Sequence, residues 1–71
     1  MTQNIKNYLV ANVKSLVDED LGEKMIRKIE DTLINKYPSD HEIIENDIDD
    51  LIKLELLDRN MYTEVKAFIC L

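Results

Sequence analysis

The chain has 71 residues and a mass of 8.3 kDa, which is the size of one small domain. Hydrophobic residues make up 45% and charged residues 34%, which excludes a disordered tail, and one glycine with one proline excludes a low-complexity chain. The formal charge of −6 at pH 7 disfavours nucleic-acid phosphates and anionic membranes and favours basic partners. We therefore expect a single domain over residues 1–71.

The first half of the chain predicts two amphipathic helices. The first covers about residues 2–17, with Thr2 as its N-cap and apolar residues at helical spacing: Ile5, Leu9, Val13 and Leu16. The second covers about residues 21–37, where Asp20 and Glu23 have the spacing of a capping box. Pro38 ends this helix, because the residue before a proline is pushed out of the α region.

The second half predicts one further helix and an ambiguous C-terminal segment. Ser39 and Glu42 have the spacing of another capping box, and the core stripe of the third helix is Ile44, Ile48, Leu51 and Ile52. Since Glu55 would fall on that same apolar face, the helix is expected to end near Leu54. Residues 61–71 read as a short helix capped by Asn60 or, through their alternation, as a strand. The predicted fold is all-α: a small bundle of three amphipathic helices with a short C-terminal helix, or a strand in its place.

Acidic residues concentrate in one segment. Residues 1–37 carry six basic and six acidic side chains, whereas residues 38–71 carry three basic and nine acidic ones. Residues 40–50, called the acidic segment below, contain six carboxylates and no Lys or Arg. On a helix, Glu42, Glu45 and Asp49 would gather on the side away from the core, with Asp47 and Asp50 on the opposite flank. The residues predicted to contact a partner are Glu42, Glu45, Asp47, Asp49 and Asp50; the alternative is a solvated face that only confers solubility.

Few residues could support catalysis or metal binding. The acidic alternation lacks the glycine and the final glutamate of an EF-hand loop, and a single glycine excludes a phosphate-binding loop. The only histidine, His41, lies near Ser39, which is better used as a helix cap. Lys24, Arg27 and Lys28 form the one basic cluster, which is too small for useful affinity to nucleic acid. We expect no enzyme, no cofactor, no metal ion and no direct nucleic-acid binding.

The sequence also predicts a cellular location and a type of source genome. No apolar run reaches the ~20 residues that span a bilayer, and residues 1–14 lack the pattern of a signal peptide. A lone cysteine, Cys70, suits a reducing compartment, so we expect a cytoplasmic protein with no membrane contact. Seven Lys against two Arg are typical of an A/T-rich genome, such as that of a low-GC bacterium or its phage.

The resulting hypothesis is a small acidic inhibitor or regulator that binds a basic protein through its third helix. One alternative is self-association through apolar residues at the margins of the helices: Tyr8, Val10, Ile34, Leu56 and Leu57. The helix order also resembles the outline of a winged-helix domain, whose third helix would read DNA. Because that helix is acidic here, a mimic of DNA phosphates is the more consistent form of this alternative. A small acidic chain in which a serine begins an acidic helix also resembles the acyl carrier proteins. Their attachment serine follows Asp and precedes Leu, whereas Ser39 lies between Pro38 and Asp40.

Overall fold

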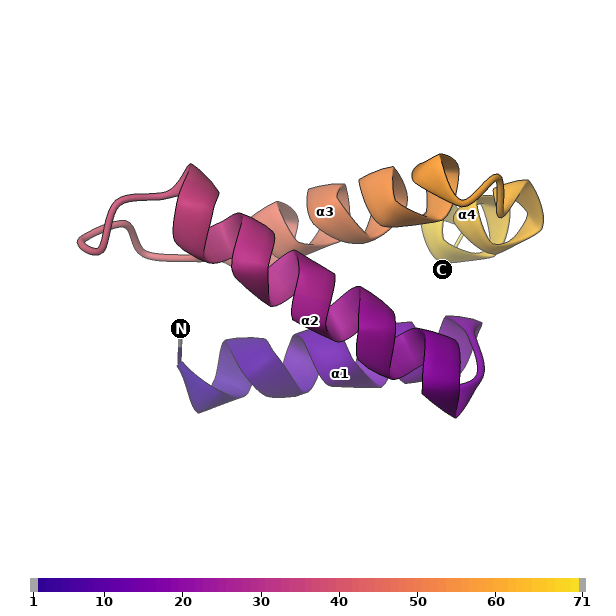
Figure 1. The fold of residues 1–71 in the computed structure, drawn as a ribbon, viewed down its shortest axis with the longest axis horizontal. Coiled ribbons are helices and arrows are strands. Elements are labelled where there is room, and N and C mark those ends of the chain that lie inside the picture. Colours follow the sequence, from indigo (N-terminus) through magenta and orange to yellow (C-terminus); the bar gives the residue numbers. More distant parts are fainter. Residues whose placement is uncertain (1, 71) are drawn as a thin grey trace.

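In the computed structural model, which describes residues 2–70, the chain forms four α-helices (Figure 1). The helices are α1 (Gln3–Leu16), α2 (Glu19–Lys36), α3 (Glu45–Asp58) and α4 (Tyr62–Ile69). The described residues contain no strand, so the all-α prediction is confirmed and the C-terminal strand alternative is wrong. A winged-helix domain would need a β-hairpin after α3, and α4 occupies that place.

The first two helices start at side-chain caps. Thr2 Oγ1 accepts a bond from the Ile5 N–H at 3.3 Å, as predicted for α1. Helix α2 begins two residues earlier than predicted, because Asp18 accepts from the Leu21 N–H at 2.8 Å and acts as its N-cap. The prediction of Asp20 as the cap is therefore wrong. Asp20 instead adds negative charge to the first turn, where the helix dipole favours it.

The start of α3 differs most from the sequence prediction. Ser39 does not cap it, because the His41 N–H bonds the Pro38 carbonyl at 3.0 Å and closes a turn there. The chain then runs without helical structure to Ile44, the N-cap residue, and α3 begins at Glu45. Glu42 therefore precedes the helix, and the carboxylate that bonds the N-cap N–H belongs to Asp47, at 3.1 Å.

Helix α3 also extends one turn beyond the predicted end at Leu54. Glu55 does lie on the buried face, with 7% of its surface exposed. Its carboxylate reaches two cations, Lys28 Nζ of α2 at 3.8 Å and Arg59 Nε at 3.6 Å. Because both cations compensate the charge, the carboxylate is tolerated beside the core and the helix continues to Asp58.

A left-handed residue ends α3 and turns the chain into α4. Asn60 has φ 59°, and the N–H groups of Asn60 and Met61 bond the carbonyls of Leu57 and Leu56 at 3.0 and 2.9 Å. These two bonds define a Schellman motif. Asn60 therefore closes α3, and the prediction that it caps α4 is wrong, since Met61 occupies that position.

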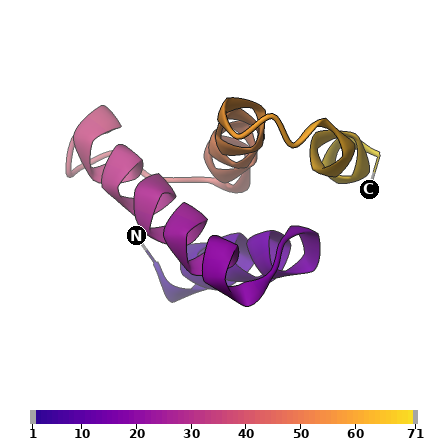
Figure 2. The ribbon, with the colours of Figure 1, turned by 45° about the vertical axis from the view of Figure 1, so that its right-hand side comes forward.

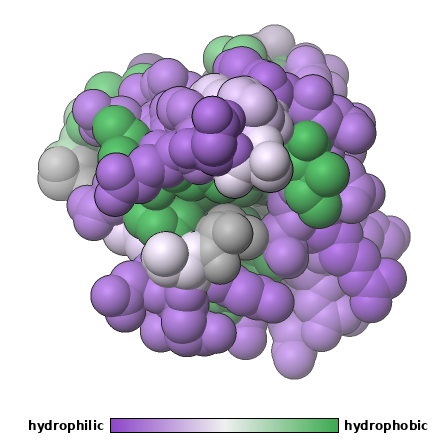
Figure 3. All heavy atoms as spheres, turned by 90° about the vertical axis from the view of Figure 1, so that its left-hand side faces the viewer, coloured by the Kyte–Doolittle hydropathy of each residue, from purple (hydrophilic) through white to green (hydrophobic). Residues whose placement is uncertain are grey.

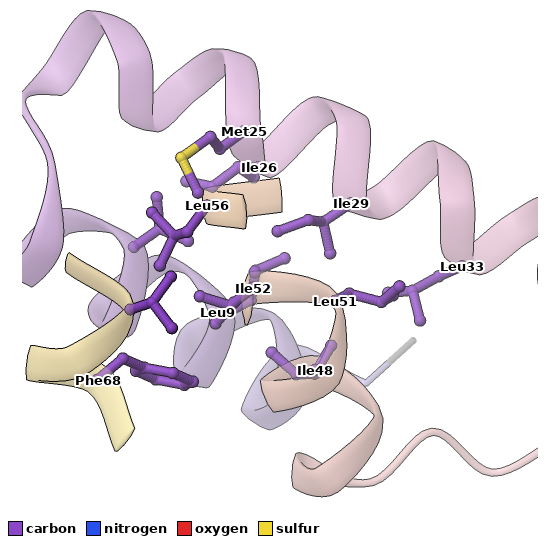
Figure 4. Packing of buried hydrophobic residues seen from close by; sticks show 12 residues of the cluster. Leu9, Met25, Ile26, Ile29, Leu33, Ile48, Leu51, Ile52, Leu56 and Phe68 are labelled. Atoms are coloured by element: carbon purple, nitrogen blue, oxygen red, sulfur yellow. The ribbon is translucent and has the colours of Figure 1, made fainter. Parts of the chain in front are cut away.

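The core lies where all four helices meet. Both α1 and α3 contact each of the other helices, whereas α2 and α4 lie apart and share no contact. Figure 2 shows α3 and α4 side by side, almost end-on, with α1 below them and α2 running diagonally from the upper left down to α1. Side chains from all four helices converge in Figure 4, and the fully buried ones include Leu9, Met25, Ile48, Ile52 and Leu56.

Several apolar side chains predicted at the helix margins take other positions. Leu56 was expected near the surface but is fully buried, while Tyr8 and Val10 are half-buried against the core. Ile34 and Leu57 are exposed as expected. In α4, Val65 and Phe68 face the core, whereas Ile69 is exposed to solvent.

Replacing Gly22 with alanine is expected to stabilise the protein. Gly22 lies inside α2, and a Cβ there would meet side-chain atoms of Val13 and Val17 at 3.6 Å, which is ordinary van der Waals contact. Gly22→Ala should therefore raise the free energy of unfolding by about 0.5–1 kcal/mol, because alanine loses less backbone entropy. Urea denaturation measures this, and a lower midpoint would show that Val13 and Val17 do not accommodate a Cβ at position 22.

The ion pairs around Glu55 predict an asymmetric response to mutation. The double variant Lys28→Ala/Arg59→Ala should lose about 1–3 kcal/mol of unfolding free energy, because it leaves a buried carboxylate unpaired. Glu55→Met should cost less than about 1 kcal/mol, since methionine fills the same space without charge. In the Glu55→Met background the two alanine substitutions should have little further effect. Urea denaturation of the wild type and these three variants tests this, and equal costs in both backgrounds would show that the cations do not act through Glu55.

Candidate functional site

Asp47 holds together the connection between α2 and α3. Its carboxylate accepts bonds from the Ile44 N–H at 3.1 Å and the Tyr37 hydroxyl at 3.2 Å, and His41 Nε2 lies 3.2 Å away. The His41 and Tyr37 rings stack with centroids 4.2 Å apart. The Ile44 N–H bond, followed by the contacts with His41 and Tyr37, lowers the pKa of Asp47 below its usual value. A partner would have to compete with these internal bonds for Asp47.

Asp49 forms a second internal bond, between α3 and α1. Its carboxylate accepts a bond from the Tyr8 hydroxyl at 2.6 Å. This bond, together with burial and the negative charges of Asp49 and Glu45, raises the pKa of Tyr8 to about 12. Asp49 therefore joins two helices, and it is less accessible to a partner than the sequence pattern suggested.

The other three predicted contact residues are exposed. Glu42 lies in the connection, Glu45 is the first residue of α3, and Asp50 is on the outer face of α3. Within residues 2–70, none of these three forms a salt bridge or a side-chain hydrogen bond. The five predicted residues thus divide into two that hold the fold and three that are free. They do not form the two helix faces expected from the sequence, because Glu42 is outside the helix.

Glu42 and Glu45 border an apolar hollow that the sequence did not reveal. The hollow has a volume of about 550 Å³ and lies between the start of α1 and residues 41–45; we call it the end hollow. Its apolar lining comes from Ile5, Ile43 and Ile44. Figure 3 looks onto this end of the molecule and shows hydrophobic surface in a recess bordered by hydrophilic residues. Ile43 was not predicted as part of a site, because the third helix was predicted to include it, whereas α3 begins at Glu45.

Ile44 is an unusual N-cap. Its hydrocarbon side chain cannot accept a bond from the first N–H groups of α3, and half of its surface is exposed (50%). Helices with an aliphatic N-cap are typically about 1 kcal/mol less stable than those with Ser, Thr, Asp or Asn. Asp47 compensates only in part, because it satisfies the N–H of Ile44 itself.

The residues considered for other chemistry are placed elsewhere. Of the basic cluster, Lys28 reaches Glu55, and Lys24 and Arg27 are exposed on α2. His41 contacts a carboxylate and a phenol ring, and Cys70 is exposed after α4. Within residues 2–70, no three His, Cys, Asp or Glu side chains converge as metal ligands would.

No protein-family model matches the chain, and no curated protein or solved structure shows significant similarity to it. None of the helices described between residues 2 and 70 has the length and apolar character needed to cross a bilayer. The function is therefore inferred from the residues of the chain itself.

The Tyr8–Asp49 bond predicts a stability change that depends on pH. Tyr8→Phe should lower the free energy of unfolding by about 1 kcal/mol at pH 7, because it removes a hydrogen bond to a carboxylate. The pKa of folded Tyr8, about 12, lies above the ordinary value of 10.0, so the folded state holds this proton more tightly. The advantage of the wild type is therefore complete below pH 10 and is lost as the pH rises towards 12.

Urea denaturation of both proteins at several pH values measures this difference. Tyr62→Phe is the matched control, because the Tyr62 hydroxyl bonds only the exposed Asn60 side chain, at 3.0 Å. A wild-type advantage over Tyr8→Phe that stays constant from pH 9 to pH 11 would contradict a tighter hold on the Tyr8 proton.

Proposed function

We propose that this protein is a non-enzymatic binding module that blocks or regulates a partner protein by covering a basic surface. Its contact residues are Glu42 and Glu45, and Asp50 of α3 is a further exposed carboxylate of the acidic segment. In this proposal Asp47 and Asp49 support the surface from within, because their carboxylates are engaged by Tyr37, His41 and Tyr8.

The observation that carries the proposal is the density of carboxylates in the acidic segment, which has six within eleven residues and no Lys or Arg. Elsewhere in the chain, only Glu30, 3.9 Å from Lys6, and Glu55, near Lys28 and Arg59, form ion pairs with Lys or Arg within the described residues. Exposed acids such as Glu23 and Asp58 are also unpaired, but basic residues stand close to them in the sequence. In the acidic segment, no Lys or Arg forms an ion pair within the described residues. Like charges so close together repel one another, and a cationic partner would relieve that repulsion. A mimic of DNA phosphates would use the same carboxylates against a nucleic-acid-binding protein.

Self-association is the second candidate, and exposed leucines on α3 favour it. Leu54 and Leu57 are one turn apart on the outer face, with 52% and 43% of their surfaces exposed. Two copies could bury these leucines against each other, but Asp50 and Asp58 lie on the same helix and would face their counterparts. Charge repulsion makes this face less favourable than a basic partner.

Charge reversal at the free carboxylates tests the proposed function. Glu42→Lys/Glu45→Lys should weaken partner binding more than tenfold, because attraction to a basic surface becomes repulsion. The control, Glu23→Lys/Asp58→Lys, makes the same change in net charge at exposed acids towards the opposite end of the molecule (Figure 1). It should leave affinity within about twofold. Asp49 is left unchanged, because its substitution would also remove the bond from Tyr8.

The partner is first captured from a lysate of the source cells and then titrated by calorimetry at low and high salt. Wild-type affinity should fall with added salt, and the Glu42→Lys/Glu45→Lys variant should lose that dependence. Equal weakening by both double variants would show that only net charge matters. Full binding by both would exclude the acidic segment as the contact.

A further inference from the structure

We propose that the end hollow is a docking site for a short partner segment that presents one large apolar side chain flanked by Lys or Arg. This inference rests on the proposed function and adds the chemistry of the partner: an apolar anchor in the hollow and cations on its border.

The first argument is the exposed isoleucine at the N-cap of α3. Ser, Thr, Asp or Asn at position 44 would stabilise the helix better than isoleucine does. Half of the Ile44 surface is exposed to solvent, so the burial of this side chain in the folded chain is incomplete. A partner side chain seated in the end hollow would contact Ile44 and complete its burial.

The second argument is the combination of an apolar lining with charge of one sign. Ile5, Ile43 and Ile44 supply the apolar surface, and Glu42 and Glu45 supply two carboxylates. No Lys or Arg of residues 2–70 lines the hollow. Lys and Arg side chains are complementary to such a surface, because their aliphatic stems pack on apolar groups while their charged ends meet carboxylates.

Charge also distinguishes a basic segment from a second copy of the chain. In a symmetric dimer each hollow would face its own counterpart, which would bring Glu42 and Glu45 of one copy against those of the other. Each copy carries a net charge of −6, which adds to the repulsion. The hollow therefore suits a basic partner better than another copy.

A neighbouring hollow of similar size lacks the excess of carboxylates that gives the end hollow its preference for a basic segment. It has a volume of about 560 Å³, shares Ile43 and His41 with the end hollow and is lined by Ile34, of which 75% is exposed. Its charged residues, Lys6 and Glu30, are 3.9 Å apart and neutralise each other. This second hollow has apolar surface but no charge preference, and nothing in it specifies an occupant.

The test uses two synthetic peptides and nuclear magnetic resonance. One peptide has a central leucine flanked on each side by a glycine and two lysines, and the other has alanine in place of the leucine. At low salt and about 1 mM peptide, the leucine peptide should bind the wild type about five- to tenfold more tightly, because the leucine side chain is removed from water. The largest shifts should fall on the backbone amides of Ile5, Ile43, Ile44 and Glu45.

Ile44→Ser separates binding from stability. It supplies a polar N-cap, so the melting temperature should be unchanged or higher, while the preference for the leucine peptide should fall to about twofold or less. Leu54→Ser is the matched control, because Leu54 is equally exposed, at 52%, and lies outside the hollow. It should keep the full preference. The Glu42→Lys/Glu45→Lys variant should bind neither peptide.

Each other outcome has a defined meaning. Equal binding of the two peptides, with both lost in Glu42→Lys/Glu45→Lys, would overturn the docking site while leaving the acidic contact surface in place. Binding that survives the charge reversal, or no binding of the leucine peptide at all, would overturn the docking site. Only the partner titration of the charge-reversal variants decides the proposed function. Self-association of the unliganded protein that Ile44→Ser abolishes, measured by sedimentation, would assign the hollow to a second copy instead.

Discussion

The burial of one face of α3 is the constraint on which the rest of this small structure depends. Ile48, Ile52 and Leu56 of this helix are fully buried, and α3 contacts each of the other helices. A core of this size supplies only about 3–5 kcal/mol of net stability, so no large part of that face could be given up. Three acidic side chains of α3 are therefore stabilised by other parts of the fold. Glu55 forms ion pairs with Lys28 and Arg59. Asp47 and Asp49 accept hydrogen bonds from Tyr37, at the end of α2, and from Tyr8 of α1.

These internal bonds divide the acidic segment into carboxylates that join elements of the fold and carboxylates that remain exposed. The hydroxyl of Tyr37, at the end of α2, bonds Asp47, and the hydroxyl of Tyr8, in α1, bonds Asp49. These two carboxylates therefore connect α3 to its neighbours on either side. Glu42 and Glu45 stand at the end of the molecule beside the start of α1, and no Lys or Arg of residues 2–70 lines the hollow there. Their negative charge remains available beside an apolar hollow. A surface of this kind combines the long-range attraction of charge with the short-range gain of apolar burial.

At Ile44, helix stability and the proposed binding favour different residues. A polar residue at this N-cap would strengthen α3, whereas isoleucine extends the apolar lining of the end hollow to its exposed edge. Asp47 limits the cost by bonding the Ile44 N–H and by gathering Tyr37 and His41 around the connection. Local departures from the most stable choice are expected where a surface is used for binding.

The sequence by itself determined the three longer helices, most of their apolar faces and the end of α2 before Pro38, because helical periodicity and the backbone restriction before proline are local properties. It left residues 61–71 open between a helix and a strand. It also located the acidic segment, including Glu42, Glu45 and Asp50. Only the tertiary structure decided where α2 and α3 begin, since Asp18 competes with Asp20, and a turn at Pro38 replaces the predicted cap at Ser39. It also decided that α3 passes through Glu55, that Asp47 and Asp49 bond inward, and that Ile5 meets Ile43 and Ile44 around one hollow. These outcomes depend on cations, hydroxyls and apolar groups brought together from distant parts of the chain, and the spacing of residues along one helix does not contain that information.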